Sequence, residues 1–423
     1  MLLLLALAAL TLAYALASRG GRRLGLTPPI VFTAVGLAAA HFADSIPHLE
    51  GDNGGVLSLS EATLVLVLFT GATEIDLSAF RKALRLPERL LGIGFPLTFL
   101  AGWGAALWLL PDLSMATAAL VAIVLTPTDA ALGRAVIIDE RLPLRIRQTI
   151  NAESGFNDGL AFPFFAFVLA LAAGEAMLGS RATAAAGLGV QLAVGLLGLP
   201  LGALLGYGGG WLSAHARRRD WAEPAYLKLG LLTLPAIAYA AAELAEVNGF
   251  LAAFAAGLLF GPGFLRDGGP VNAAALPDAD SEASLQRFAE VESELLTIVV
   301  FFAFGAVPLA ASLEHLAWRH AAYAALSLTV VRMLPVALSL LGTGVGWRTT
   351  AFVGWFGPRG LGSIVYLLLA AESLLDAQRP NAAAPLSEVN AVVCATVFGS
   401  ILLHGITSGF LPGWYGRAVE RDN

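Results

Sequence analysis

Residues 151–159 of the chain read Asn151-Ala152-Glu153-Ser154-Gly155-Phe156-Asn157-Asp158-Gly159. These carboxylate, amide and hydroxyl side chains stand inside a strongly apolar segment. On a helix, Ser154 and Asp158 lie one turn apart on one face, and Glu153 and Asn157 form the neighbouring stripe. Because ionisable groups at bilayer depth cost much free energy, the stretch predicts an ion or proton pathway across a membrane.

The composition is that of a membrane protein. Of the 423 residues, 57% are hydrophobic and only 13% are charged, whereas a soluble domain needs far more polar surface. The net charge of −6 therefore says little about partners. The sequence contains no zinc-spaced Cys/His set, glycine-rich phosphate loop or basic-aromatic surface, so we expect no cofactor and no nucleic-acid partner. The single cysteine, Cys394, is expected to be a packing residue.

Apolar segments of the length of a membrane span recur along the whole chain. A span needs about 20 apolar residues, and we place thirteen, at residues 2–18, 27–43, 56–74, 89–110, 114–131, 147–173, 182–212, 225–242, 248–262, 290–308, 316–342, 349–370 and 387–410. No basic residue precedes the first apolar run and Arg19, Arg22 and Arg23 follow it, which favours a retained span over a signal peptide. The segment 268–284 is expected to be a connecting loop.

Loop charges predict the orientation of these spans. Basic residues gather in the loops after odd-numbered spans, as at Arg217, Arg218 and Arg219, whereas the loops after even-numbered spans are poor in arginine, with Arg379 an exception. Positive loops stay on the cytoplasmic side. The pattern therefore predicts an outer amino terminus, a cytoplasmic carboxyl terminus and a place in the cell (inner) membrane.

Two spans are interrupted in their apolar middle. The fifth contains Thr126-Pro127-Thr128-Asp129 and the twelfth contains Gly357-Pro358-Arg359-Gly360-Leu361-Gly362. Unwound backbone at membrane depth is tolerated only where it is buried or lines a cavity. Asp129 and Arg359 have the signs needed to compensate half-helix dipoles. The breaks fall fifth in each of two six-span sets joined by a seventh span, which predicts inverted repeats with a midplane site.

The sequence resembles the monovalent cation:proton antiporters, specifically the NhaP/NHE-like sodium/proton antiporters. Arg332 is similar to the buried arginine of that family. Four patterns carry the resemblance over essentially the whole chain: Phe69-Thr70-Gly71-Ala72-Thr73-Glu74-Ile75-Asp76-Leu77, Thr126-Pro127-Thr128-Asp129, Glu153-Ser154-Gly155-Phe156-Asn157-Asp158-Gly159 and Gly357-Pro358-Arg359-Gly360.

The resemblance implies roles for individual residues. Asp158 is similar to the carboxylate that binds either the cation or protons, and Asn157 stands where electrogenic relatives have a second aspartate. Glu153 is expected to pair with Arg332. The remaining cation site is implied to comprise Glu74, Ser154, Thr128 and Asp129, with Na⁺ bound by Asp158, Glu74, Ser154 and Thr128.

The resemblance also implies an all-α, NhaA/NapA-like fold that works as a homodimer by moving a core domain against an interface domain. The expected division is interface 1–84, core 85–180, linker helix 181–218, interface 219–312 and core 313–423.

The charges of the predicted site residues also predict how many protons are exchanged for each cation. Burial disfavours the charged form of Asp158, so protons can compete with a cation there. Since Asn157 does not titrate and Arg332 stays protonated, we expect electroneutral exchange of one Na⁺, or Li⁺, for one H⁺. K⁺/H⁺ exchange by the same fold is the open alternative, and an ion channel is less favoured because no repeated pore loop is present. Without a Ser/Lys, Asp/Asp or metal-ligand set, we expect a transporter and not an enzyme.

Overall fold

The computed structural model describes residues 10–16, 18, 21, 26–42, 54–73, 75, 85–173, 190, 193–266, 282–376 and 383–420. Within these ranges every regular element is helical. The helices are α2 (Pro28–Phe42), α3 (Gly54–Thr73), α5 (Arg85–Arg89), α6 (Phe95–Leu109), α7 (Met115–Val124), α8 (Ala130–Ile137), α9 (Leu144–Ala173), α11 (Gly198–Arg218), α12 (Pro224–Leu244), α13 (Gly249–Arg266), α14 (Glu282–Phe304), α15 (Ala310–Ser312), α16 (Trp318–Leu328), α17 (Val330–Leu340), α18 (Trp347–Trp355), α19 (Leu361–Asp376), α20 (Ala383–Ser408) and α21 (Leu411–Glu420). Short π-helical turns, Leu90–Gly94 and Gly305–Leu309, join α5 to α6 and α14 to α15, and a 3₁₀ turn, Leu313–His315, follows α15.

The predicted all-helical membrane fold is confirmed. Among the described residues, 8 helices are long and apolar enough to cross a membrane, and shorter apolar helices cover 28–41, 115–124, 249–264 and 361–374. Together they correspond to the second to thirteenth predicted spans. The first predicted span, residues 2–18, lies largely outside the described residues, as does most of the predicted loop 268–284.

Both predicted helix breaks are present. The fifth span stops at Val124 and resumes as α8, which continues to Ile137 beyond the predicted end at residue 131. The twelfth span is divided between α18 and α19. Ser114 caps α7 and Asp129 caps α8, each accepting a backbone N–H with its side chain.

Some boundaries differ from the prediction. The eleventh span is interrupted at Thr329, whose backbone leaves the helical region and whose hydroxyl donates to the carbonyl of Ala325. The seventh span ends at Arg218 instead of residue 212, because basic side chains are stabilised at a helix carboxyl end. The amphipathic helix α21 was not predicted, since its alternation of apolar and polar residues is too short to read as a span.

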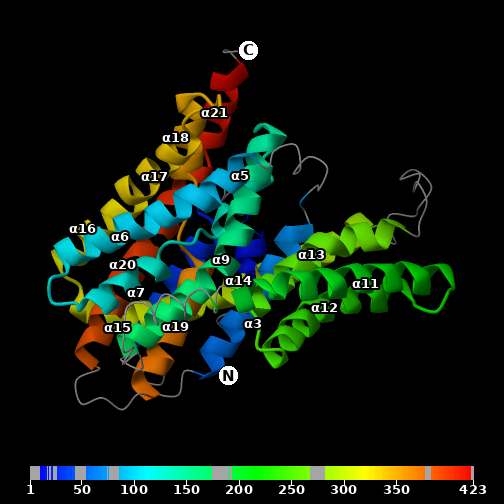
Figure 1. Ribbon diagram of the computed structural model, residues 1–423, viewed down its shortest axis with the longest axis horizontal. Helices are drawn as coiled ribbons and strands as arrows, with labels where there is room; N and C mark the ends of the chain where they lie inside the picture. Colours follow the sequence, from blue (N-terminus) through cyan, green and yellow to red (C-terminus); the bar gives the residue numbers. More distant parts are fainter. Residues whose placement is uncertain are drawn as a thin grey trace.

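In Figure 1, α11, α12 and α13 form a first group of helices on the right, and α16, α17 and α18 lie with α6 on the left. Between them lie α9 and α14. Within the first group, α11 and α13 pack backbone to backbone. A Cβ on any of four glycines of α11, spaced four residues apart, would overlap a backbone carbonyl oxygen of Asn248 or of α13: Gly198, Gly202, Gly206 and Gly210. Such close approach of small residues is a common way to join helices in a membrane.

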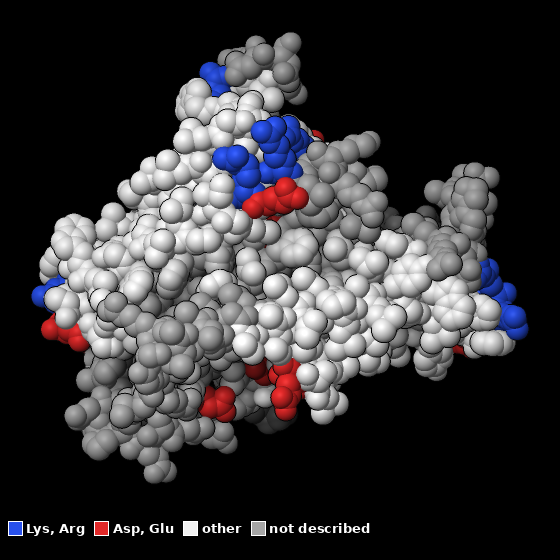
Figure 2. Space-filling view, viewed as in Figure 1, with Lys and Arg blue, Asp and Glu red and all other residues white. Residues whose placement is uncertain are grey.

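Charged side chains lie at the ends of the helices. In Figure 2, the larger Lys and Arg patches lie at the upper and right-hand ends of the molecule, while Asp and Glu lie beside the upper patch and along the lower edge.

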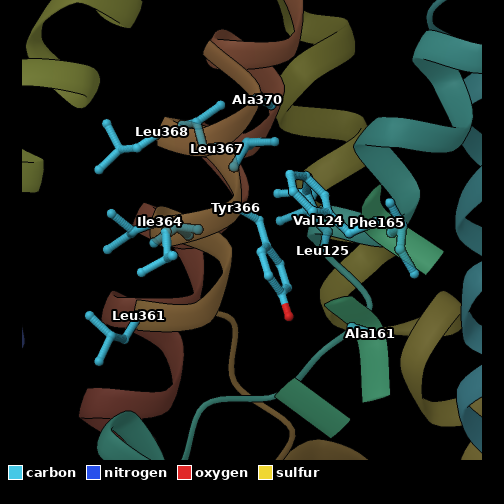
Figure 3. Close-up of a cluster of buried hydrophobic side chains, with 14 of the residues drawn as sticks. Val124, Leu125, Ala161, Phe165, Leu361, Ile364, Tyr366, Leu367, Leu368 and Ala370 are labelled. Atoms are coloured by element: carbon cyan, nitrogen blue, oxygen red, sulfur yellow. The ribbon is translucent and has the colours of Figure 1, made fainter. Parts of the chain in front are cut away.

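A buried hydrophobic cluster lies next to the two breaks. Val124, Ala161, Phe165 and Tyr366 belong to one buried hydrophobic cluster, which draws on α7, α9 and α19 (Figure 3). The ring of Tyr366 stacks on that of Phe165 with 4.7 Å between centroids. Its hydroxyl donates to the backbone carbonyl of Asp158. The cluster therefore packs against the polar stretch 151–159 of α9.

Candidate functional site

The site begins on α9, whose polar stripes point inward. Glu153, Ser154, Asn157 and Asp158 are all buried in the middle of a helix that is otherwise apolar. The helical spacing puts Ser154 and Asp158 on one face, as expected. The fifth-span break packs against this face, because α7, α8 and α9 are in contact.

Thr128 joins the break to α9. Its hydroxyl lies 3.0 Å from that of Ser154, and it also accepts a hydrogen bond from the Asn157 amide at 2.8 Å. The backbone N–H of Thr128 donates back to Oδ1 of Asn157 at 3.2 Å. Asn157 therefore binds Thr128 through both ends of its amide, which holds the break in place and leaves the hydroxyls of Thr128 and Ser154 adjacent.

Asp158 lies beside the second break. Its Oδ1 is buried and has no hydrogen-bond partner among the described residues. A Cβ built on Gly362 would stand 2.5 Å from that oxygen, so the carboxylate lies directly on the backbone at the start of α19. An acceptor at a helix amino terminus is favourably placed. Ser154 lies one turn before Asp158 on the same face of α9. An unpartnered carboxylate oxygen and hydroxyls on one helix face are the kinds of oxygen donor that suit a hard cation.

The two breaks cross, and each charged residue neutralises two helix ends. Asp129 accepts from Ala131 N at 2.8 Å and from Leu361 N at 2.8 Å, so one carboxylate caps the amino ends of both α8 and α19. Arg359 donates to the carbonyl of Leu125 at 2.8 Å and to that of Gly357, just past the carboxyl ends of α7 and α18. This geometry is that of dipole compensation. It also occupies both oxygens of Asp129.

Glu153 and Arg332 form a bidentate ion pair. The guanidinium of Arg332 donates to the two carboxylate oxygens of Glu153 at 2.6 and 2.9 Å, and both side chains are buried. The guanidinium also lies against Gly357, where an added Cβ would collide with it. The pair therefore joins α9 to α17 and packs against Gly357 of the second break.

A cavity of about 390 Å³ lies near this group. Its lining includes Arg134, Arg141, Ala130, Ala131 and Asn151, and it does not include Asp158. Asn151 donates to the carbonyl of Gly71 at 3.0 Å, which joins α9 to α3 across the cavity. Of the residues that line the cavity, Ala130 follows Asp129 in the sequence, and Asn151 lies about one turn before Ser154 on α9. The cavity therefore lies close to the site.

One predicted site residue, Glu74, lies outside the described residues, so its place relative to Asp158 stays a prediction. Among the residues that the structure does describe, no three or more His, Cys, Asp or Glu side chains come together as a metal centre would require. A cation here would be cargo, held by hydroxyl and carboxylate oxygens.

Three contacts at the site were missed by sequence reasoning. Ser363 donates to the carbonyl of Val124 at 2.8 Å and so helps to hold the crossing together. Tyr366 donates to the Asp158 carbonyl, and Gly362 gives the carboxylate its place. The pattern Gly360-Leu361-Gly362 was a signal for close approach, but Ser363 and Tyr366 carry no local signal, because their partners are about 240 and 210 positions away.

Comparison with known proteins gives one consistent result. The family model described as "Sodium/hydrogen exchanger, transmembrane" matches residues 6–412. A Na⁺/H⁺ antiporter of Schizosaccharomyces pombe is 28% identical over 397 residues, which cover 87% of this chain and 80% of that protein. The K⁺/H⁺ antiporter NhaP2 of Shewanella oneidensis is 30% identical over 213 residues, which cover 48% of this chain and 34% of that protein.

A solved structure has the same fold. The structure of the sodium proton antiporter MjNhaP1 from Methanocaldococcus jannaschii matches over 99% of both chains with a TM-score of 0.73 and 21% identity. The crossed breaks, the buried carboxylate and the family match over nearly the whole length lead to one conclusion. This chain belongs to the transmembrane sodium/hydrogen exchanger family.

Proposed function

We propose that this protein is a secondary active antiporter that exchanges Na⁺, or Li⁺, for H⁺ one for one, with Asp158 holding either the cation or the proton. The observation that carries this proposal is the balance of buried charge around the crossed breaks.

Five side chains of the charged types are buried among the described residues, each no more than 3% exposed: Asp129, Glu153, Asp158, Arg332 and Arg359. Two guanidinium groups against three carboxylates leave a formal charge of −1. One proton or one monovalent cation at Asp158 brings the sum to zero. Because an uncompensated charge in a low-dielectric interior is costly, the site crosses the membrane loaded with one or the other and not empty.

The other two carboxylates are poor choices for the exchanging group. Asp129 accepts backbone N–H groups with both oxygens at two helix amino ends, and Glu153 accepts two N–H groups from Arg332. Charge-assisted hydrogen bonds of this kind favour the ionised form. Asp158 alone keeps a free buried oxygen, which supports it as the exchange site.

The ligand set is proposed on the same geometry. The carboxylate of Asp158 and the hydroxyls of Thr128 and Ser154 would bind the cation, and Glu74 would approach from the end of α3. Hard cations such as Na⁺ take oxygen ligands of these kinds. Asn157 supports the site by holding Thr128.

The proposed transport cycle is alternating access of the elevator kind. The interface domain would be formed by spans 1–3 and 8–10 (residues 1–84 and 219–312) and the core by spans 4–6 and 11–13 (85–180 and 313–423), with 181–218 as linker helix. The loop charges support a carboxyl terminus in the cytoplasm and a place in a cell (inner) membrane. We further propose that the protein works as a homodimer.

The test is cation-induced proton flux in proteoliposomes. We expect Na⁺ and Li⁺ to release protons from acid-loaded vesicles and Asp158→Asn to abolish that release. Retention of exchange in Asp158→Asn would overturn the assignment of the exchange site. A second candidate is K⁺/H⁺ exchange, which the similarity to the Shewanella antiporter favours, and K⁺ is therefore measured in the same experiment; flux with K⁺ and none with Na⁺ would replace the sodium proposal.

A further inference from the structure

The break of the twelfth span is held by side chains that the proposed exchange does not use. Ser400 Oγ accepts the backbone N–H of Arg359 at 2.7 Å. Nε2 of His404 lies 2.8 Å from the carbonyl of Trp355, and its Nδ1 lies 3.1 Å from Ser400 Oγ. Both residues belong to α20 and are buried. They therefore hold the end of α18 and the first unwound residues at the same time.

A carbonyl oxygen only accepts, so Nε2 of His404 carries the proton that faces Trp355. The other ring nitrogen, Nδ1, lies 3.1 Å from the hydroxyl and 3.0 Å from the backbone carbonyl of Ser400. Both nitrogens of the ring are therefore held by named polar groups. The charged groups that interact with the ring are Arg332 of α17 and Arg359 of the break.

In the first repeat, the break of the fifth span is also held by a serine of the next span. Thr128 and Arg359 each follow the proline of a break, and each bonds to a serine of the next span, Ser154 or Ser400. Four residues beyond these serines, one turn along the helix, stand Asp158 and His404. By position in the repeat, His404 is therefore the counterpart of the exchanging carboxylate.

We propose that Ser400 and His404 are positioning residues for the cation site, which fix the second break so that α19 begins against Asp158. This inference rests on the proposed function. Few residues separate the contacts with α20 from the cation site. Trp355 and Arg359 are held by α20, and two residues beyond Arg359 the backbone N–H of Leu361 donates to Asp129. Gly362, the next residue, lies on the Asp158 carboxylate. A shift of the break moves the positive end of α19 relative to the bound cation.

This role predicts a change in cation affinity without a change in the titrating group. His404→Ala removes one of the two hydrogen bonds that the Trp355 carbonyl accepts, the other coming from the backbone N–H of Gly357 at 2.9 Å. We therefore expect the apparent KM for Na⁺ to rise by about tenfold, with a smaller change in maximal rate. Ser400→Ala, which frees the Arg359 N–H, should act in the same direction. His404→Gln keeps a donor for Trp355 and an acceptor for Ser400, and should return KM to within about threefold of the unchanged protein.

The experiment measures Na⁺-dependent proton flux against Na⁺ concentration and pH for these three variants in proteoliposomes. Thr396→Val is the matched control, because Thr396 is buried one turn earlier on α20 and its hydroxyl donates only to the carbonyl of Val392. Elution as a single species and the melting temperature in detergent report whether each variant folds.

The proposal is supported if KM rises in both alanine variants, the glutamine variant restores it, and the pH profile keeps its position throughout. It is overturned if KM equals that of the unchanged protein, or if the glutamine variant is as impaired as His404→Ala with a displaced pH profile, since the ring would then titrate. Absence of Na⁺- or Li⁺-driven flux in the unchanged protein would instead refute the proposed function, so the two failures are distinct.

Discussion

Replacing Glu153 by glutamine changes the buried charge at the crossed breaks from −1 to zero while Asp158 is empty. In this variant, binding of a cation or a proton at Asp158 makes the buried charge net positive. In the unchanged protein the same binding event brings the buried charge from −1 to zero. Glu153 precedes Asp158 by five residues on α9, which places the carboxylates about 10 Å apart. With an effective dielectric constant of about 20, the lost attraction is about 1.7 kcal/mol, and the apparent KM for Na⁺ should rise roughly fifteenfold.

The matched control is the double variant Glu153→Gln/Arg332→Met. It removes both members of the ion pair, so the remaining charges again sum to −1 and KM should return toward that of the unchanged protein. The single variant also leaves a buried guanidinium without its partner, which costs about 3–5 kcal/mol of stability, whereas loss of the whole pair costs less. Both are measured by Na⁺ titration of proton flux and by melting in detergent. An unchanged KM in the single variant, or a double variant no better than the single, would refute the charge-balance argument.

Two further predictions concern the site and the cavity near it. Gly362→Ala places a Cβ 2.5 Å from Oδ1 of Asp158 and should raise the KM for Na⁺ by about tenfold or more; Gly104→Ala, where the added carbon meets nothing within 4 Å, is the control and should leave KM unchanged. In the cavity lining, the hydrogen bond from Arg141 lowers the pKa of Asp139. A depressed pKa contributes stability that is present above the unfolded pKa and lost as pH falls through the folded one. Arg141→Ala should therefore lower the melting temperature at neutral pH, and the difference between the two proteins should shrink as the pH falls through the folded pKa of Asp139; a difference that stays the same at every pH would contradict it.

The sequence predicted the features that depend on local pattern. Span length, loop charge and the two Pro-containing breaks each follow from a few adjacent residues, and the structure places helices at the second to thirteenth predicted spans. The stripe of Ser154 and Asp158 follows from helical periodicity alone. The interruption at Thr329 was missed because it arises from a side chain bonding to the preceding turn, which many mid-helix threonines do without ending a helix.

The features that depend on long-range packing could not be predicted. That Asp129 caps α19 as well as α8 requires the two breaks to cross, and no spacing within the fifth span contains that information. The role of Asn157 as the holder of Thr128 also appears only once α9 and the break are placed together. The contacts of His404 with Ser400 and Trp355 likewise depend on how α20 packs against the second break, which no local pattern of α20 encodes.

In the proposed cycle Asp158 carries one cation or one proton and never neither. The measurement that tests this most directly is the null point of exchange in proteoliposomes whose membrane potential is clamped at several values. We expect no net flux when the Na⁺ concentration ratio across the membrane equals the H⁺ ratio, at every potential, and no exchange at all in Asp158→Asn. A null point that moves with the potential, or that lies at the square of the H⁺ ratio, would show that more than one proton is exchanged and would contradict it.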